Sequence, residues 1–447
     1  MRIDLFRALA RLFLIAIVAG PAVAAPQIQT WQTDNGTKVL FVEAADLPML
    51  DVRVVFDAGS ARDGEKSGIA SMTAALLRQG AGDWDADAIA ERLEGVGANL
   101  GTDADRDMAS VSLRTLTREP AMDTAVDTLI EILARPRFAA EDFDRVQQNS
   151  LIGLRQDEQS PGTVGKKALY RKIFGTHPYA EDPAGTLETV AALTRDDAVA
   201  FHHEYYAAAN AVIAIVGALS RTEAEALATR ITEGLPTGKP APDLPPVPPL
   251  TAATSTDIEF PSSQTHIYAG QPGMHRGDPD YFPLYVGNHI LGGSGLVSLL
   301  MEEVREKRGL SYSVYSYFLP LAVDGPFMMG LQTKNTQGEE ARRVMLETLA
   351  HFAEQGPTEG DLAAALKNIT GGFPLRIAGN NKIVSYLAVI GFYDLPLDYL
   401  DRFTETVSAV TKDQIRDAFQ RRIHADRLAV VQVGPGPARM AESGGEP

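Results

Sequence analysis

A proline-rich stretch in the middle of the chain constrains the fold more than any other feature of the sequence. Seven prolines lie between Leu235 and Pro249. Because proline has a fixed φ and no backbone N–H, this stretch can form neither a helix nor a central strand. We therefore predict a semi-rigid linker over residues 235–254. It separates a first domain (residues 25–234) from a second (residues 255–437), which a flexible tail (residues 438–447) follows.

The two halves carry a similar unit near their ends. Thr194 leads through an amphipathic stretch to an apolar run that ends at Gly217, and Thr411 leads likewise to Gly434. The spacing from Thr to Gly is 23 residues in both cases. A threonine that caps a helix before a buried strand is a common unit, but its symmetric placement about the linker indicates an internal duplication.

Within the first half, apolar periodicity predicts both strands and helices. The predicted strands cover residues 38–43, 52–57 and 109–116, and the predicted helices cover residues 67–78, 86–96, 119–133 and 141–158. The helices cluster instead of alternating strictly with the strands. This order predicts an α+β fold in which each half is a mixed or antiparallel sheet packed against helices.

The N-terminus resembles a secretory signal. Arg2, Arg7 and Arg11 precede a short apolar run, and the small residues 22–24 form a cleavage site, so we expect residues 1–24 to be a signal peptide. The alternative, a membrane anchor, needs about 20 apolar residues. We therefore expect a periplasmic or otherwise exported protein, without a membrane segment after cleavage. The absence of cysteine suits an oxidising compartment and excludes disulfides and thiolate metal sites.

Two motifs resemble a known family. Residues 59–63 (GSARD) and 67–70 (SGIA), where a helix opens, are followed much later by residues 304–317 (VREKRGLSYSVYSY). Together they resemble the M16 zinc metallopeptidases, the family of pitrilysin and the mitochondrial processing peptidase. The resemblance extends over the whole mature chain. It implies two homologous halves that form a clamshell-like assembly with a partner, as in short bacterial members that work in pairs.

Active members of that family carry His-x-x-Glu-His on the helix after the Ser-Gly pair. Two histidines four residues apart project from one helical face onto one zinc ion, and the glutamate activates the bound water. Here the corresponding residues are Ser71, Ala74 and Ala75, and the third ligand, a glutamate on a later helix, corresponds to Gly153 or its neighbour Ile152. Neither alanine nor glycine coordinates zinc. The resemblance therefore implies a degenerate site with no metal in this chain.

The histidines of the chain do not replace that site. Adjacent residues on a helix point about 100° apart, so His202, His203 and Glu204 cannot chelate one ion and are expected on a solvated helix face. His177, before Pro178, is expected in a loop. The other histidines are scattered without ligand spacing: His266, His275, His289, His351 and His424.

The second half retains residues that the resemblance associates with catalysis. Gly292, Gly293, Ser294 and Gly295 precede a helix expected over residues 296–307, and Arg305 and Tyr312 lie seven residues apart. The resemblance implies that the glycine-rich turn lines the substrate chamber. It also implies that Arg305 and Tyr312 hold the substrate backbone and the oxyanion, which suits a forked donor and a phenol. The alternative is that Arg305 is a helix C-terminal cation and that Tyr312 is a strand residue.

These observations favour a non-catalytic subunit of a heterodimeric M16-type zinc endopeptidase. A catalytic partner with His-x-x-Glu-His would hold the zinc, and the substrate would be an unfolded peptide. One alternative is a homodimeric peptide-binding or assembly protein without proteolytic activity; another is a peptidase with an unrecognised site. The formal net charge of −17 argues against a nucleic-acid partner.

Overall fold

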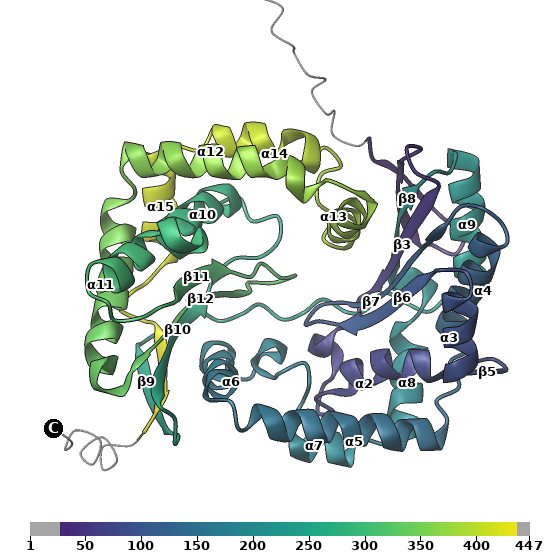
Figure 1. The fold of residues 1–447 in the computed structure, drawn as a ribbon, viewed down its shortest axis with the longest axis horizontal. Helices are drawn as coiled ribbons and strands as arrows, with labels where there is room; N and C mark the ends of the chain where they lie inside the picture. The colour runs from purple at the N-terminus through teal and green to yellow at the C-terminus, as the bar shows by residue number, and fades with distance from the viewer. Residues whose placement is uncertain (1–26, 436–447) are drawn as a thin grey trace, which may run out of the picture.

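Each half of the chain is built around one β-sheet, as the computed structural model shows for residues 27–435 (Figure 1). The predicted signal peptide and tail lie outside the described residues. The first sheet has the order β1 (Gln29–Gln32), β2 (Lys38–Glu43), β8 (Ala211–Gly217), β3 (Met49–Phe56), β7 (Ala109–Leu116) and β6 (Asn99–Ala104). The second has the order β9 (Thr254–Glu259), β13 (Ala429–Gly434), β10 (Gln264–Pro272), β12 (Pro326–Lys334) and β11 (Val314–Phe318).

The two sheets share their strand directions as well as their order. β2 runs parallel to β8, as β9 does to β13, and the remaining neighbours pair antiparallel in both sheets. The register agrees too, because Glu43 lies opposite Gly217 and Glu259 lies opposite Gly434. The predicted mixed sheets are confirmed, and the repeat extends through five strands of each half. Of the strands in these two sheets, only β1 lacks a counterpart in the part of the chain that the structure describes.

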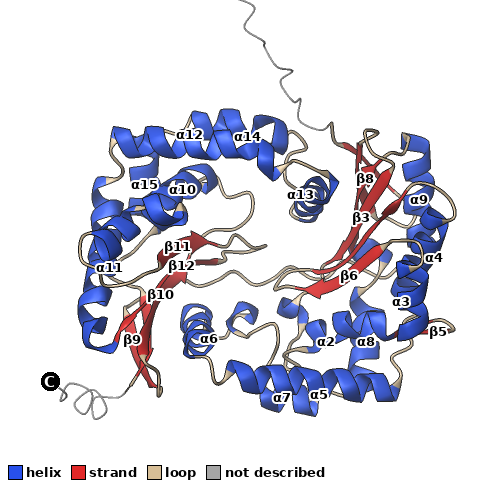
Figure 2. Ribbon diagram, in the orientation of Figure 1, coloured by secondary structure: helices blue, strands red, loops and turns tan. Residues whose placement is uncertain are grey.

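The helices cluster on the sheets (Figure 2). Those of the first half are α2 (Ile69–Leu76), α3 (Ala86–Glu94), α4 (Ala121–Ala134), α5 (Ala140–Asp157), α6 (Pro161–Phe174), α7 (Leu187–Ala192), α8 (Arg195–Tyr205) and α9 (Arg221–Glu233). Those of the second half are α10 (Tyr281–Asn288), α11 (Gly338–Gln355), α12 (Glu359–Arg376), α13 (Asn380–Phe392), α14 (Tyr399–Ser408) and α15 (Lys412–Arg422). A short hairpin, β4 (Gly80–Ala81) and β5 (Trp84–Asp85), precedes α3.

The repeated Thr-to-Gly unit has the predicted structure. Thr194 and Thr411 cap α8 and α15, each through a reciprocal capping box with the third helical residue. Each helix leads to the central strand that ends at Gly217 or Gly434. Strands 38–43 and 109–116 are also confirmed, whereas the strand predicted at 52–57 begins earlier, at Met49.

The halves exchange one helix each. α6 of the first half packs on β10 and β13, and α13 of the second half packs on β3 and β8 (Figure 1). A glycine allows each close approach: a Cβ at Gly165 would lie 2.6 Å from the Tyr268 ring, and one at Gly391 would lie 2.5 Å from the Leu40 side chain. Each sheet is therefore completed by a helix from the other half.

A buried carboxyl group also joins the halves. Asp107, in the turn between β6 and β7, accepts hydrogen bonds from the Tyr179 hydroxyl at 2.5 Å and from the hydroxyl of Tyr393, just after α13, at 2.8 Å. It also accepts one from the Ala322 N–H, in the loop before β12, at 2.8 Å. Burial raises the pKa of Asp107, and the tyrosine hydrogen bonds oppose that rise. This network fixes the first half against two segments of the second.

Residues 234–253, between α9 and β9, contain no helix or strand. Their carbonyl groups are held against the first half. Arg62 Nη1 donates a hydrogen bond to Pro242 O at 2.6 Å, and His177 Nε2 lies 2.9 Å from Pro245 O. The proline-rich segment is thus anchored to the first half at Pro242 and Pro245. No helix among residues 27–435 is long and apolar enough to cross a membrane.

Candidate functional site

The degenerate zinc-site positions lie on two helices, α2 and α5, that pack together. Ser71 is half-buried, and its hydroxyl donates a hydrogen bond to Pro183 O at 2.7 Å. Ala74 is buried, while Ala75 and Gly153 are exposed. A Cβ added at Gly153 would meet no heavy atom within 4 Å, so the space beside α5 is open there.

The start of α2 is set by the first family-like motif. The buried carboxyl of Asp63 accepts hydrogen bonds from the N–H groups of Gly68 (2.7 Å) and Ala70 (3.1 Å), which are free at the first turn of a helix. Burial raises the pKa of Asp63 to about 7, against these two hydrogen bonds. Gly59 is required because a Cβ there would lie 2.3 Å from Arg106 O. Residues 59–70 thus position α2.

The residues at the α2 and α5 positions do not fit a zinc ion. Their only polar side-chain atom is the hydroxyl of Ser71, and that group is hydrogen-bonded to Pro183. A catalytic zinc site needs three ligands from His, Cys, Asp or Glu. No metal-dependent step can therefore be assigned to these two helices.

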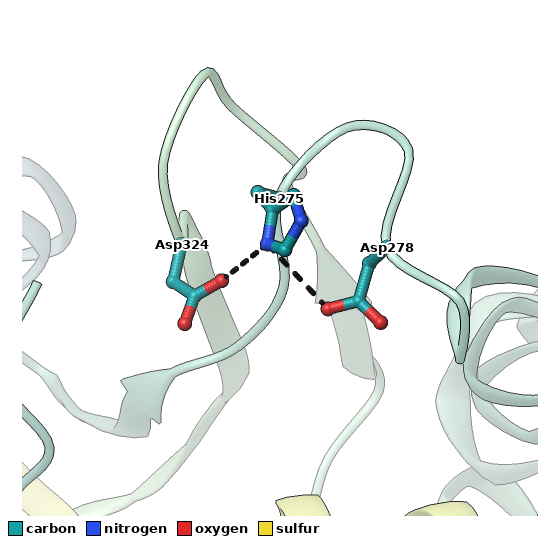
Figure 3. A group of neighbouring side chains, drawn as sticks. All are labelled: His275, Asp278 and Asp324. Carbon is teal, nitrogen blue, oxygen red and sulfur yellow. Dashed lines mark hydrogen bonds and ion pairs between the residues drawn. The ribbon is translucent and has the colours of Figure 1, made fainter. Parts of the chain in front are cut away.

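A histidine and two aspartates come together elsewhere, and sequence reasoning missed them (Figure 3). His275 Nδ1 lies 2.9 Å from Asp324 Oδ1 and 3.6 Å from Asp278 Oδ2. Asp278 is fully buried, and its carboxylate pairs with the Arg422 guanidinium. The Arg422 guanidinium already neutralises the carboxylate of Asp278, the most buried residue of the three. We therefore interpret the cluster as a structural contact that holds the loop of His275 against the loop of Asp324. Asp324 lies 49 residues from His275, so no local spacing could reveal it.

Arg305 and Tyr312 lie on either side of a tight turn in the second half. Arg305 is half-buried in the π-helical turn Met301–Glu306, and Tyr312 is 84% exposed just before β11. Gly309, at φ +63°, reverses the chain between them. No hydrogen bond or ion pair joins the two side chains in the structure of residues 27–435. The neighbouring Lys307 and Arg308 both pair with Glu303.

The glycine-rich turn packs against β11. Gly292 lies in the π-helical turn His289–Gly293, and a Cβ there would lie 2.4 Å from Ser316 Oγ. Gly295 has φ +63°, and Gly293 and Gly295 are exposed while Ser294 is half-buried. The turn therefore needs glycine for packing and backbone conformation. The chamber-lining role of residues 292–295 stays a prediction.

The helix predicted over 296–307 begins later than expected. Leu296 and Val297 form a short 3-10 turn and are 66% and 82% exposed. Ser298 then accepts a hydrogen bond from the Met301 N–H at 3.4 Å and starts the helical segment. The apolar residues at 296 and 297 suggested helix periodicity, but Ser298, which follows them with an extended backbone (φ −82°, ψ 156°), separates them from the helix.

One histidine prediction is wrong. His202 is not solvated: it is buried, its Nε2 lies 3.0 Å from Leu133 O, and its ring stacks on Tyr206. Burial lowers the pKa of His202 to about 4. His203 and Glu204 are exposed, as expected. His177 lies in a loop, as predicted, but it is buried there, and its Nδ1 accepts a hydrogen bond from the Tyr179 N–H at the start of a 3-10 turn.

Comparisons with known proteins agree with the fold. Residues 38–186 match the family described as insulinase (peptidase family M16), and residues 192–369 match the family described as the peptidase M16 inactive domain. A crystal structure titled as a peptidase M16 inactive domain from Pseudomonas fluorescens is 40% identical, with a TM-score of 0.89, and the match covers 92% of this chain and 98% of that one.

Two curated relatives are more distant. A protein of Helicobacter pylori named non-peptidase homologue YmxG is 27% identical, over 91% of this chain and 94% of its own length. An uncharacterised zinc protease of Streptomyces coelicolor is 25% identical, over 78% of this chain and 76% of its own length. Relatives with both kinds of name thus share most of their length with this chain.

Proposed function

The chain belongs to peptidase family M16, and from that premise we propose that it is the non-catalytic subunit of a two-chain M16-type zinc endopeptidase. The descriptions "inactive domain" and "non-peptidase homologue" among its matches support a non-catalytic M16-like protein. We propose in addition that it is a subunit that completes a partner's active site. This finer assignment rests on the missing zinc ligands of the first half and on the hydrogen-bond donors Arg305 and Tyr312 of the second half.

The observation that carries the proposal is the composition of the α2 and α5 positions. Ser71, Ala74, Ala75 and Gly153 leave no metal ligand and no general base on the two helices where the family resemblance places them. The joint loss of ligands and base leaves nothing there to activate a water molecule. The helices themselves are well formed, since Asp63 still caps α2. The fold is kept while the chemistry is lost.

The second half supports a role beside another chain. Lys307 and Arg308 are neutralised by Glu303, whereas Arg305 takes part in none of the ion pairs of the described residues. Tyr312, Leu296 and Val297 are exposed close by in the sequence. A free guanidinium and phenol can donate hydrogen bonds to a peptide carbonyl and to an oxyanion. We propose that Arg305 and Tyr312 donate these bonds at the zinc site of the partner subunit.

The remaining parts of the proposal follow from the sequence. The partner is an M16-type chain with His-x-x-Glu-His, and it holds the zinc ion. The substrate is an unfolded peptide, since an extended chain can pair with a sheet edge with little sequence preference. The signal-like residues 1–24 support export to the periplasm.

Purification from the native host tests this function. We expect a stoichiometric, zinc-bearing partner of similar mass to copurify, and the isolated chain to contain well under one zinc per molecule and to leave unfolded peptides intact. One equivalent of tightly bound zinc in the isolated chain, with chelator-sensitive cleavage, would contradict the proposal. A homodimer that binds unfolded peptides without a partner would favour the peptide-binding alternative.

A further inference from the structure

The outer edge of the second sheet is open where the same edge of the first sheet is covered. In the first sheet, β2 pairs with β8 on one side and with β1 on the other, with Gln32 opposite Lys38 and Gln29 opposite Phe41. In the second sheet, β9 pairs with β13 and has no second neighbour among residues 27–435. The first half thus shows how a strand pairs with this edge, and the described residues of the second half contain no equivalent strand.

The two edges are equivalent in register. The Ala44 N–H donates to Gly217 O at 2.8 Å just after β2, and the Phe260 N–H donates to Gly434 O at 2.7 Å just after β9. At the other end, Lys38 lies opposite Val212 as Thr254 lies opposite Ala429. Residues 254–257 of β9 therefore correspond to residues 38–41 of β2, the residues that β1 covers.

The free backbone groups of β9 follow from this register. The N–H groups of Thr254 and Phe260 both bond toward β13, and successive residues of a strand alternate in direction. The N–H and C=O groups of Ser255, Asp257 and Glu259 therefore point to the open edge. The counterpart of Ser255 is Val39, whose carbonyl accepts a hydrogen bond from the Thr30 hydroxyl of β1 at 2.9 Å.

A groove of about 820 Å³ lies beside this edge, between β9 and α11. Its lining includes Thr254 and Ser255 of β9, Val430 of β13, and Leu346 of α11. In the first half, α9 packs against both β2 and α4, the helix that follows β7 as α11 follows β12. The groove is thus the place that α9 fills in the first half.

The first half also shows how side chains fill this place. Trp31 of β1 packs edge-on against Phe41 of β2, with ring centroids 6.4 Å apart. The Arg221 guanidinium at the start of α9 lies 3.9 Å from the Trp31 ring centroid. In the first half, the edge of β2 is therefore covered by the strand β1, and the Arg221 guanidinium stacks on the Trp31 side chain of that strand.

The charges at the open edge specify a basic occupant. Arg342 and Arg343 of α11 each pair with a glutamate of their own helix. Asp257, Glu259 and Glu340 are exposed and have no ionic partner in the described part of the chain. Asp257 and Glu259 share one face of β9, because alternate residues of a strand point the same way. Cationic side chains at every second position of an added strand would meet them.

We propose that the open edge of β9 binds an extended, lysine- or arginine-bearing segment of another protein. The segment adds as a strand antiparallel to residues 254–257, in the place that β1 takes in the first half. Main-chain hydrogen bonds to Ser255 and Asp257 supply affinity, and the carboxylates select for positive charge. This binding site is separate from the peptidase chemistry and does not depend on it.

Fluorescence anisotropy with a labelled octapeptide of alternating lysine and threonine tests the proposal. We expect saturable binding that Asp257→Pro weakens by about tenfold or more, because proline removes an edge-facing N–H and leaves the bonds to β13 in place. Ser255→Pro is a second variant with the same logic. Thermal unfolding verifies that each variant is folded, and a peptide of alternating glutamate and threonine should not bind.

Charge variants provide a matched control. Asp257→Asn and Glu259→Gln should each weaken binding about two- to fivefold at low salt. Glu43→Gln changes the first-half counterpart of Glu259 and should have no effect, because β1 already pairs with residues 38–41 of the same strand.

Three results would overturn the proposal. The first is the absence of saturable binding, or equal binding by the wild type and both proline variants. The second is binding only by a chain ending at Pro435, which would assign the edge to the chain's own C-terminal residues. The third is a homodimer that Asp257→Pro dissociates in sedimentation, without peptide binding, which would make the occupant a second copy.

Discussion

The two halves have one strand order and one register, but they differ at their rims. The first half closes the outer edge of its sheet with β1 and α9, and it carries small residues at the α2 and α5 positions. The second half leaves the edge of β9 open and exposes Leu296, Val297 and Tyr312 on turns beside β11. After the duplication, the buried frame stayed the same while the surfaces that meet other molecules diverged.

The largest effect should come from the exchanged helices, where the halves are most alike. Leu169 of α6 and Leu387 of α13 are both fully buried. Leu169→Ala and Leu387→Ala should each lower the free energy of unfolding by about 2–5 kcal/mol, because each leaves a cavity in the other half's core. Urea denaturation measures this, and Leu375→Ala, at a 70% exposed position, should change little. A loss at only one of the two leucines would show that the exchange is not symmetric.

The next effect concerns chemistry, where the halves should differ most. In a reconstituted pair, Arg305→Ala or Tyr312→Phe should leave assembly intact and lower turnover about a hundredfold, or about 3 kcal/mol, since one oxyanion donor is lost. Steady-state peptide cleavage measures this. Arg308→Ala is the matched control, because Arg308 is already paired with Glu303. Wild-type turnover of the Arg305 variant would assign it a structural role, and an equal loss at Arg308 would indicate general electrostatics.

A histidine distinguishes the halves in their response to acid. His202 lies eight residues after the cap of α8, and the same position in α15 is the buried Phe419. Burial lowers the pKa of His202 from 6.5 to about 4, so between these values the unfolded chain binds a proton that the folded chain does not. The group should therefore cost stability as the pH falls through this window, about 2 kcal/mol at pH 5.

His202→Phe converts this position to that of the second half. Comparing urea unfolding of the wild type and the variant at pH 7 and pH 5 isolates the histidine from the other titrating groups. Between pH 7 and pH 5, the variant should lose about 2 kcal/mol less free energy of unfolding than the wild type. An unchanged difference would mean that His202 is protonated in the folded state.

The smallest effect is expected at the degenerate metal site. Gly153→Ala should stabilise the protein by about 0.4–1 kcal/mol, because the site is exposed and open and alanine is the better helix former. Gly165→Ala, on the next helix, should instead destabilise it, because the added Cβ would lie 2.6 Å from the Tyr268 ring. Thermal unfolding compares the two. Destabilisation by Gly153→Ala would show that another group occupies the space beside α5.

Much of the frame was predictable because it follows from local signals. The apolar runs at 38–43 and 109–116 match β2 and β7, and the threonine caps at 194 and 411 fix where α8 and α15 begin. The missing zinc ligands were also local, because they depend on residue types at helical spacing.

Features that need tertiary contacts escaped prediction. The burial of His202 depends on Leu133 and Tyr206, and the partners of Asp107 come from segments far away in the sequence. Leu296 and Val297 had helix-like periodicity, but the extended backbone of Ser298 separates them from the helical segment that follows. No pattern of residues in one segment could reveal that α6 would pack on the sheet of the second half and α13 on the sheet of the first half.

Because α13 covers the first sheet but is encoded in the second half, the first sheet cannot be fully covered until late in synthesis of the chain. All strands of the first sheet have been synthesised once residue 217 is made, yet the face that β3 and β8 present to α13 stays bare until residue 392 emerges. During that interval an apolar sheet surface is accessible to holdase chaperones and to aggregation. Newly made first halves are therefore expected to depend on chaperones, and a first half truncated before α13 is expected to keep this face exposed.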